Sequence, residues 1–144
     1  MSAFDDFKKH FGPRQRWVGY LATADGTRPT VRPVTFFLSG RRLCFCTGAQ
    51  DAKVKQLRAN AAVEVLLPFK KGRYGGYYRI TGSAEILTDA AGRRRILRKA
   101  PFATEGYWEG PQDPRLAVVV VHIKRARYLP PGAGAIYEEP VDLK

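Results

Sequence analysis

The sequence predicts a mainly β protein, an antiparallel barrel with short helices at its margins. Three observations lead to this prediction. Segments that alternate apolar and polar residues recur along the chain, Gly-containing turn signals separate several of them, and two or three short stretches have helical character instead. With 144 residues, 44% of them hydrophobic, we expect one domain over residues 1–144 with a core of its own.

The first half of the chain is expected to form a short helix followed by paired strands. Residues 1–12 predict an amphipathic N-terminal helix, capped by Ser2, with three phenylalanines on one side. Asp25-Gly26 and Ser39-Gly40 are typical of tight turns between antiparallel strands. The predicted strands are residues 17–24, 30–38, 42–47 and 61–67, and the helix before the last of them is residues 48–57.

The second half is expected to add two long strands, a helix and a tail. The strand over 77–87 contains Gly82, which indicates a bulge or a bend. A helix over 89–99 follows, and then a strand over 116–128 whose valine run predicts burial on both faces. The Pro- and Gly-rich tail, residues 130–144, has no regular pattern, and we expect it to be ordered only against a partner.

Cysteine usage and targeting signals indicate a cytoplasmic protein. Cys44 and Cys46 are two apart on one predicted strand, where they share a face but are poorly placed to form a disulfide. We expect free thiols in a reducing compartment, and no metal site, since His10 and His122 are distant in sequence. The N-terminus lacks the form of a signal peptide, and the longest apolar run, 116–121, is too short to span a membrane.

The net charge of +12 raises the possibility of nucleic-acid binding. The cations do not form one block, however, and are dispersed over strand ends, turns and a helix face. A basic surface of this kind would also steer small anionic ligands toward the protein. Nucleic-acid binding is therefore the less favoured alternative.

The segment 31–67 carries the strongest functional signal. Lys53 falls in the first turn of a predicted helix, where the helix dipole is already positive, so an anion sharing the site would explain it. Arg32 on a nearby strand and Thr47 before the helix add a second cation and a hydroxyl, and the three could hold a phosphate. The alternative is that Lys53 is a solvated helix residue and Asp51 an ordinary N-cap.

These residues resemble the pyridoxamine 5'-phosphate oxidase-like, FMN-binding split-barrel superfamily, in particular its short general-stress-protein-like members. The matching motifs are Arg32-Pro33-Val34, Phe45-Cys46-Thr47 and the run from Asp51 to Leu57, and the resemblance covers roughly residues 17–86. It implies a split β-barrel of Greek-key type. It also implies a homodimer with FMN at the subunit interface.

The resemblance further implies which residues contact the cofactor. Lys53 and Arg32 would be charge partners of the FMN phosphate, and Thr47 a hydroxyl donor. Backbone atoms of four residues would edge the flavin ring, and Tyr77, where relatives carry glutamine, would come from the second subunit. The complete expected set is Arg32, Pro33, Val34, Thr35, Cys46, Thr47, Lys53 and Tyr77.

One position departs from the family pattern. Relatives usually carry serine where this chain has Asp51, and a carboxylate beside a phosphate is repulsive. Either Asp51 turns away, or the phosphate depends on Lys53, Arg32 and Thr47 alone, or flavin binding is weak.

The implied reaction class is electron or hydride transfer through FMN, with the cofactor supplying the chemistry. Neither a catalytic residue nor a substrate is indicated by the sequence. True pyridoxamine phosphate oxidase activity is not expected, because those enzymes carry an Arg-x-His segment where this chain has Arg125-Ala126-Arg127. The alternative is a non-catalytic stress or redox module that binds a flavin or haem, and the sequence leaves FMN, a deazaflavin and haem open as the native ligand. Trp108, in the loop over 102–114, is expected either to pack against the core or to act as a lid.

Overall fold

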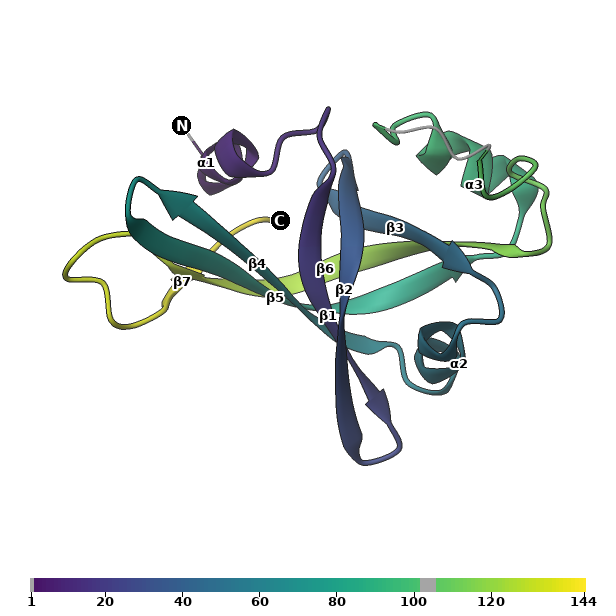
Figure 1. Cartoon of the computed structure of the whole chain (residues 1–144), viewed down its shortest axis with the longest axis horizontal. Helices are drawn as coiled ribbons and strands as arrows, with labels where there is room; N and C mark the ends of the chain where they lie inside the picture. The colour runs from purple at the N-terminus through teal and green to yellow at the C-terminus, as the bar shows by residue number, and fades with distance from the viewer. Residues whose placement is uncertain (1, 102–105) are drawn as a thin grey trace.

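The computed structural model describes residues 2–101 and 106–144. Its strands are arranged around a barrel, with the helices at the margins (Figure 1), and the predicted fold class is confirmed. The strands are β1 (Trp17–Asp25), β2 (Arg28–Ser39), β3 (Arg42–Gly48), β4 (Ala62–Lys71), β5 (Tyr74–Leu87), β6 (Leu116–Leu129) and β7 (Glu139–Val141), and the helices are α1 (Ala3–His10), α2 (Ala52–Ala59) and α3 (Ala90–Leu97).

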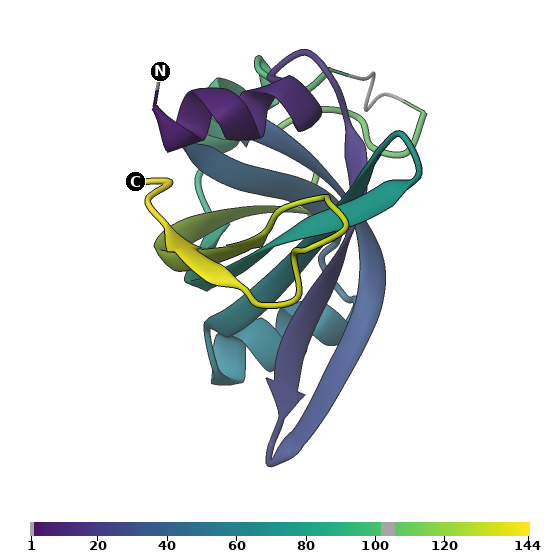
Figure 2. The ribbon, with the colours of Figure 1, turned by 90° about the vertical axis from the view of Figure 1, so that its left-hand side faces the viewer.

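The strand order makes this a Greek-key barrel. The sheet runs β3-β2-β1-β4-β5-β6-β7, every pairing is antiparallel, and an additional pairing of β3 with β6 closes the ring. β1, β2 and β3 follow one another as hairpins, and β4 then returns to lie beside β1. Figure 2 shows α1 across one end of this barrel, near β7, and α2 at the opposite end beside the long β1–β2 hairpin.

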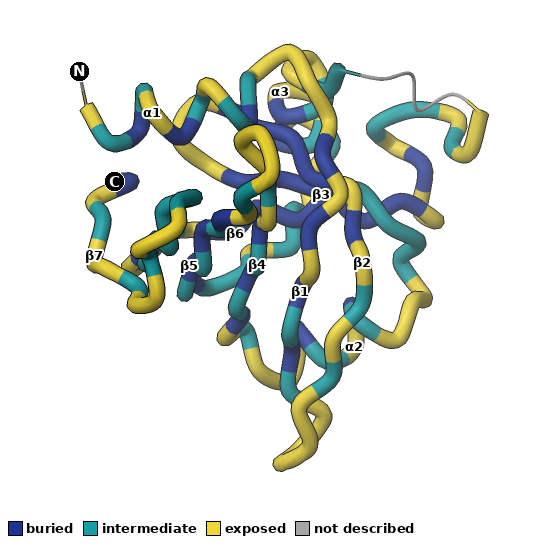
Figure 3. The backbone as a smooth tube through the Cα atoms, turned by 60° about the vertical axis from the view of Figure 1, so that its left-hand side comes forward, coloured by how far each residue is buried: buried dark blue, intermediate teal, exposed yellow. Residues whose placement is uncertain are grey.

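The valine run of β6 is buried on both faces, as the sequence predicts. Val119 and Val121 face the barrel interior, where they join a cluster that includes Phe45. Val118 and Val120 face outward into a second cluster, which α3 covers with Ile96. β3 and β6 therefore appear as buried segments in the middle of the molecule (Figure 3).

The cysteines lie on the outward side of β3. Cys44 is fully buried and Cys46 half-buried, and both are free thiols. Burial raises the pKa of Cys46 to about 12, and it does the same for Cys44. Both thiols therefore stay protonated at neutral pH, so neither has the thiolate that nucleophilic chemistry needs.

Helix α1 closes one end of the barrel. Ser2 and Asp5 form a capping box, in which each side chain accepts a hydrogen bond from the other residue's backbone N–H. Phe7 is completely buried and stands edge-on against Trp17 and Tyr78, at centroid separations of 6.3 and 5.0 Å.

Among the described residues, no helix has the length and apolar character that crossing a membrane requires.

Two local features follow from single residues. Helix α2 begins at Ala52 and not at residue 48, because Asp51 adopts extended backbone geometry and caps the helix with its side chain.

The β5–β6 register shifts between Thr81 and Gly82, which confirms the predicted bulge. A Cβ at Gly82 would lie 2.4 Å from the carbonyl oxygen of His122, so the close approach of the two strands there requires glycine.

The loop before β6 contributes to packing. Its residues 102–105 lie outside the described part of the chain. Trp108 packs against the outward cluster under α3, which supports the packing role over the lid. Asp113 orders the loop, since its carboxylate accepts hydrogen bonds from the Glu109 backbone N–H and the Arg115 guanidinium.

The expectation for the tail is wrong. The tail is held by its own chain, because β7 pairs with β6 and places Val141 opposite Ala126. Just before β7, Glu138 accepts hydrogen bonds from Arg79, at 2.6 and 2.9 Å, and from the Tyr77 hydroxyl at 2.7 Å. These contacts hold the pKa of Glu138 at about 2, with Arg79 the larger cause and Tyr77 the next.

We predict that Glu138→Gln weakens the attachment of the tail. The pKa of the carboxylate is lowered, so its contribution to stability is present above the ordinary glutamate pKa and is lost as pH falls toward 2. At pH 7 the variant should lose on the order of 1 kcal/mol of unfolding free energy, typical of a partly exposed ion-pair network. Thermal denaturation and amide hydrogen exchange of β7 measure this loss.

The matched control is Glu139→Gln, which removes a neighbouring carboxylate that has no ion pair among the described residues. At pH 2 the Glu138→Gln variant and the wild type should become alike. Equal melting temperatures at pH 7 for wild type and Glu138→Gln would contradict the role of this network.

Candidate functional site

The site is built where β3 ends and α2 begins. The Lys53 ammonium lies 2.9 Å from the Thr47 hydroxyl and 2.9 Å from a carboxylate oxygen of Asp51. The Lys53 side chain is only 13% exposed, so it folds back over the helix start and does not extend into solvent. The structure thus brings Lys53 and Thr47 together, as expected for a phosphate site, and the solvated alternative for Lys53 is wrong.

Asp51 also occupies this site. Its carboxylate accepts a hydrogen bond from the Lys53 backbone N–H at 3.0 Å, so it caps α2 as the alternative interpretation expected. Partial burial acts to raise the pKa of Asp51, but hydrogen bonds from Lys53 outweigh burial and the pKa is lowered. The carboxylate is therefore ionised at neutral pH and neutralises the cation that a phosphate would need.

Arg32 lies near this site with most of its donors already in use. One terminal nitrogen donates to the Leu21 carbonyl and the Thr23 hydroxyl, and the other donates to the Thr30 hydroxyl and the Gln56 amide oxygen, all at 2.8–3.2 Å. Burial lowers the pKa of Arg32, and the charge of Asp51 opposes this. Arg32 therefore fixes the β1–β2 hairpin against α2. Its contribution to the site is positive electrostatic potential, because its terminal nitrogens already donate hydrogen bonds elsewhere.

The hydrogen-bond acceptors of Arg32 were not predicted from the sequence, although the strand register that places two of them could have been. The β1–β2 register sets Thr23 opposite Thr30, and the turn at Asp25-Gly26 could have given this pairing. Alternation then places Arg32 on the same face as Thr30. Gln56 could not be found in this way, because it approaches from α2.

The residues expected to edge the ring lie where β2 and β3 separate. These strands pair only along Phe37–Ser39, and β3 then continues along β6. Among the described residues, 33–35 of β2 consequently pair with β1 alone, so their other backbone edge has no strand partner there. Cys46 and Thr47 are on the neighbouring stretch of β3, so the two segments flank one region beside α2.

Tyr77 is not part of this group within one chain. Its hydroxyl binds Glu138, and the residue lies opposite Pro68 and Leu129, toward the end of the barrel that is remote from α2. Alternation along β5 sets Tyr77 and Arg79 on one face and buries Tyr78 on the other, as predicted. A cofactor beside Lys53 could meet Tyr77 only if a second subunit supplied it.

Apolar side chains are exposed on the outside of the β1–β2 hairpin. Val18, Tyr20 and Val31 are 59%, 41% and 67% exposed. The register sets Val18 opposite Thr35 and Tyr20 opposite Pro33, so these five residues share one surface, here called the outer face. Two of the residues expected at the flavin ring, Pro33 and Thr35, therefore belong to an exposed and largely apolar surface.

Metal chemistry receives no support from the described residues, among which no cluster of His, Cys, Asp and Glu could hold an ion. The two histidines have different partners. His122 lies 2.8 Å from Glu85, and His10 stacks on Phe69 at a centroid separation of 4.0 Å.

Comparison with known proteins agrees with this architecture. The chain is 27% identical over 128 residues to general stress protein 26 of Bacillus subtilis, covering 88% of this chain and 86% of that protein. A haem-binding protein from Mycobacterium smegmatis shares the fold with a TM-score of 0.73 at 18% identity, over 97% of this chain and 59% of that one.

A further structural neighbour is a pyridoxamine 5'-phosphate oxidase-related, FMN-binding protein from Nostoc punctiforme, with a TM-score of 0.64 at 16% identity, over 87% of this chain and 86% of that one. The family model described as pyridoxamine 5'-phosphate oxidase matches residues 8–130. Because this match covers most of the chain, the protein belongs to the pyridoxamine 5'-phosphate oxidase family.

Proposed function

We propose that the protein is a homodimeric flavoprotein that binds FMN between its subunits and acts as an oxidoreductase. The observation that carries this proposal is the convergence of the Lys53 ammonium and the Thr47 hydroxyl at the start of α2. A cation, a hydroxyl and the first amides of a helix form a suitable set of partners for a phosphate. FMN, when bound, supplies the electron or hydride transfer.

Phosphate binding at this site requires a local exchange of partners. The Lys53 ammonium must leave Asp51 to approach the phosphate, while Thr47 can remain its neighbour. The Asp51 side chain is 41% exposed, so it can turn toward solvent without burying its charge. Arg32, held by its own hydrogen bonds, would contribute positive potential from a fixed position.

The flavin ring would lie along the backbone of Pro33, Val34, Thr35 and Cys46, next to the outer face. We propose that a second copy of the chain covers this face, since exposed Val18, Tyr20 and Val31 favour burial. The partner subunit's Tyr77 would then complete the wall of the flavin site. Hydrogen bonds from Tyr77 and Arg79 to Glu138 fix that wall before the cofactor arrives.

Haem is the second candidate ligand, because one structural neighbour binds it. Haem iron takes an axial His, Cys, Met or Tyr ligand. The Cys46 thiol, the nearest such group in sequence to Lys53, packs against the outward cluster under α3, where burial raises its pKa. FMN is therefore the better fit, and an absorption spectrum of protein purified from cells separates a flavin from a haem Soret band.

We predict that Lys53→Ala weakens FMN binding about 10- to 100-fold, because a charge-assisted hydrogen bond contributes about 1.5–3 kcal/mol and each 1.4 kcal/mol is about tenfold in affinity. Riboflavin, which lacks the phosphate, should lose much less. Quenching of flavin fluorescence measures both affinities. Lys55→Ala is the matched control, since Lys55 is an exposed cation on the same helix. Equal losses for FMN and riboflavin, or no loss for FMN, would show that the phosphate binds elsewhere.

We predict that Asp51→Ser tightens FMN binding by up to about tenfold. The substitution removes a carboxylate that competes for the Lys53 ammonium, and serine preserves the helix cap. Asp51→Asn separates the two effects, because it removes the charge without adding a hydroxyl. The same fluorescence titration applies. An affinity for FMN that is unchanged or weaker in both variants would mean that Asp51 does not oppose the phosphate.

We propose that the substrate is not pyridoxamine phosphate. The segment that holds it in true oxidases corresponds here to Arg125-Ala126-Arg127, and the Ala126 side chain is buried, 4% exposed, opposite Val141 of β7. The purified protein, loaded with FMN and supplied with oxygen, should form no pyridoxal phosphate above the blank. Sustained turnover measured by pyridoxal absorbance would refute this.

A further inference from the structure

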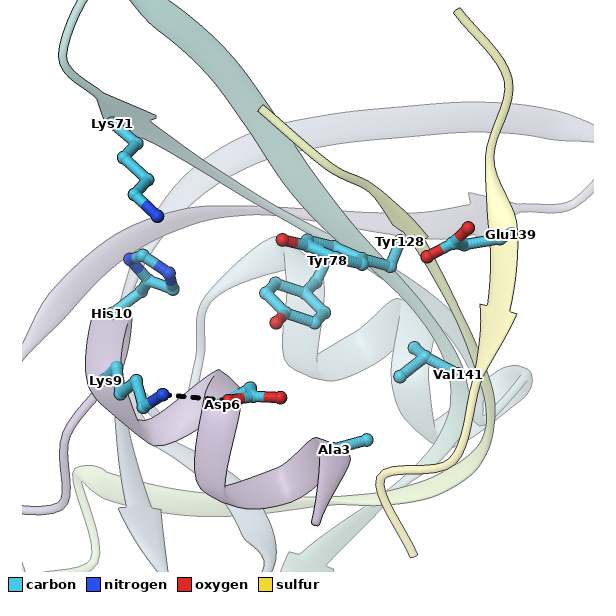
Figure 4. Close-up of a pocket in the computed structure, with 9 residues that line it drawn as sticks. All are labelled: Ala3, Asp6, Lys9, His10, Lys71, Tyr78, Tyr128, Glu139 and Val141. Carbon is cyan, nitrogen blue, oxygen red and sulfur yellow. Dashed lines mark hydrogen bonds and ion pairs between the residues drawn. The ribbon is translucent and has the colours of Figure 1, made fainter. Parts of the chain in front are cut away.

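A pocket lies at the end of the barrel opposite α2. Helix α1 and strand β7 enclose it together with the ends of β4, β5 and β6, and its volume is about 320 Å³. Figure 4 shows its lining residues, none of which belongs to the Lys53 site. The volume is at the lower end of the range for small-molecule sites, and barrel mouths are common places for such sites.

The back of the pocket is a rigid aromatic wall. The Tyr78 and Tyr128 rings are stacked at a centroid separation of 4.5 Å and an interplanar angle of 17°. Phe69 stacks on both tyrosines, and His10 stacks on Phe69 at 4.0 Å. Because several rings fix one another, the wall exists before any ligand binds, and little ordering entropy is lost on binding.

The phenol and imidazole groups of the pocket are uncharged at neutral pH. Burial, followed by the neighbouring Tyr128, raises the pKa of Tyr78, so its hydroxyl remains a hydrogen-bond donor. Burial also lowers the pKa of His10, and the nearby Lys71 and Lys9 add to this effect. The charges that face a ligand are therefore those of the lysines and carboxylates.

These charges are separated across the pocket. Lys9 is already paired with Asp6 at 3.0 Å. Lys71 and Glu139 form no ion pair within the described residues. In Figure 4 they stand on opposite sides, Lys71 next to His10 and Glu139 next to Tyr128, with the tyrosine rings between them. The pocket thus presents one uncommitted cation and one uncommitted anion over an apolar wall.

We propose that this pocket binds a small zwitterion whose two charges lie at the ends of an apolar chain, as in the ω-amino acids. The carboxylate of the ligand would face Lys71, its ammonium would face Glu139, and its apolar part would lie along Tyr78 and Tyr128. A ligand with only one charge would leave either Lys71 or Glu139 uncompensated. A face of Tyr128 near the ammonium adds cation–π attraction.

Isothermal titration calorimetry of the full chain with free ω-amino acids of increasing chain length tests this proposal. At least one should bind, and its N-acetyl and carboxamide derivatives, which each lack one charge, should bind about tenfold more weakly or worse. Lys71→Met and Glu139→Gln should weaken the parent amino acid similarly. Lys70→Met is the matched control, because Lys70 is exposed and does not line the pocket.

Saturating FMN should leave this affinity unchanged, because the two sites share no residue. The proposal is overturned if no ω-amino acid binds at millimolar concentration, if the singly charged derivatives bind as tightly as the parent, or if Lys70→Met costs as much as Lys71→Met. Competition by FMN would also overturn it, because the pocket would then not be a separate site.

Discussion

The pairing of β3 with β6 is the constraint on which the rest of the molecule depends. Residues Leu43–Gly48 lie against Leu116–Val121, where β6 is buried on both faces throughout and β3 is buried over residues 43–45. β3 follows β6 along this whole length but pairs with β2 only at Phe37–Ser39, so β2 and β3 separate after a short pairing. The same geometry carries Thr47 to the start of α2. The candidate site is therefore a consequence of how the barrel closes.

The electrostatics of the site set the strength of any phosphate contact. Lys53 is neutralised by Asp51, and Arg32 already donates four hydrogen bonds. A phosphate would thus replace existing charge-assisted contacts, each of which contributes about 1.5–3 kcal/mol, and the net gain is a difference between similar quantities. A serine at position 51 would avoid this exchange. Burial of the apolar outer face in a dimer would supply the remaining affinity through the hydrophobic effect.

Local patterns predicted the barrel well and the long-range contacts poorly. The alternation of residues along β5 predicted that Tyr77 and Tyr78 lie on opposite faces, and Gly82 predicted the bulge. Both features depend only on residues that are neighbours in the sequence. Strand β7, with three residues, is too short to show an alternation of apolar and polar residues. Glu138 accepts a hydrogen bond from Arg79, which lies 59 residues earlier in the sequence, so no local pattern indicates the contact. The Lys53–Thr47 contact was predicted because six residues separate the pair, whereas Gln56 reaches Arg32 only through the tertiary fold.

The central claim is that the region beside Lys53 binds FMN across a twofold interface. Titrating FMN into the wild-type protein, with flavin fluorescence and multi-angle light scattering recorded on the same samples, tests it most directly. The account predicts strong quenching that saturates at one FMN per chain, with the mass of a dimer. Unquenched FMN at micromolar protein, together with the mass of a single chain, would contradict it.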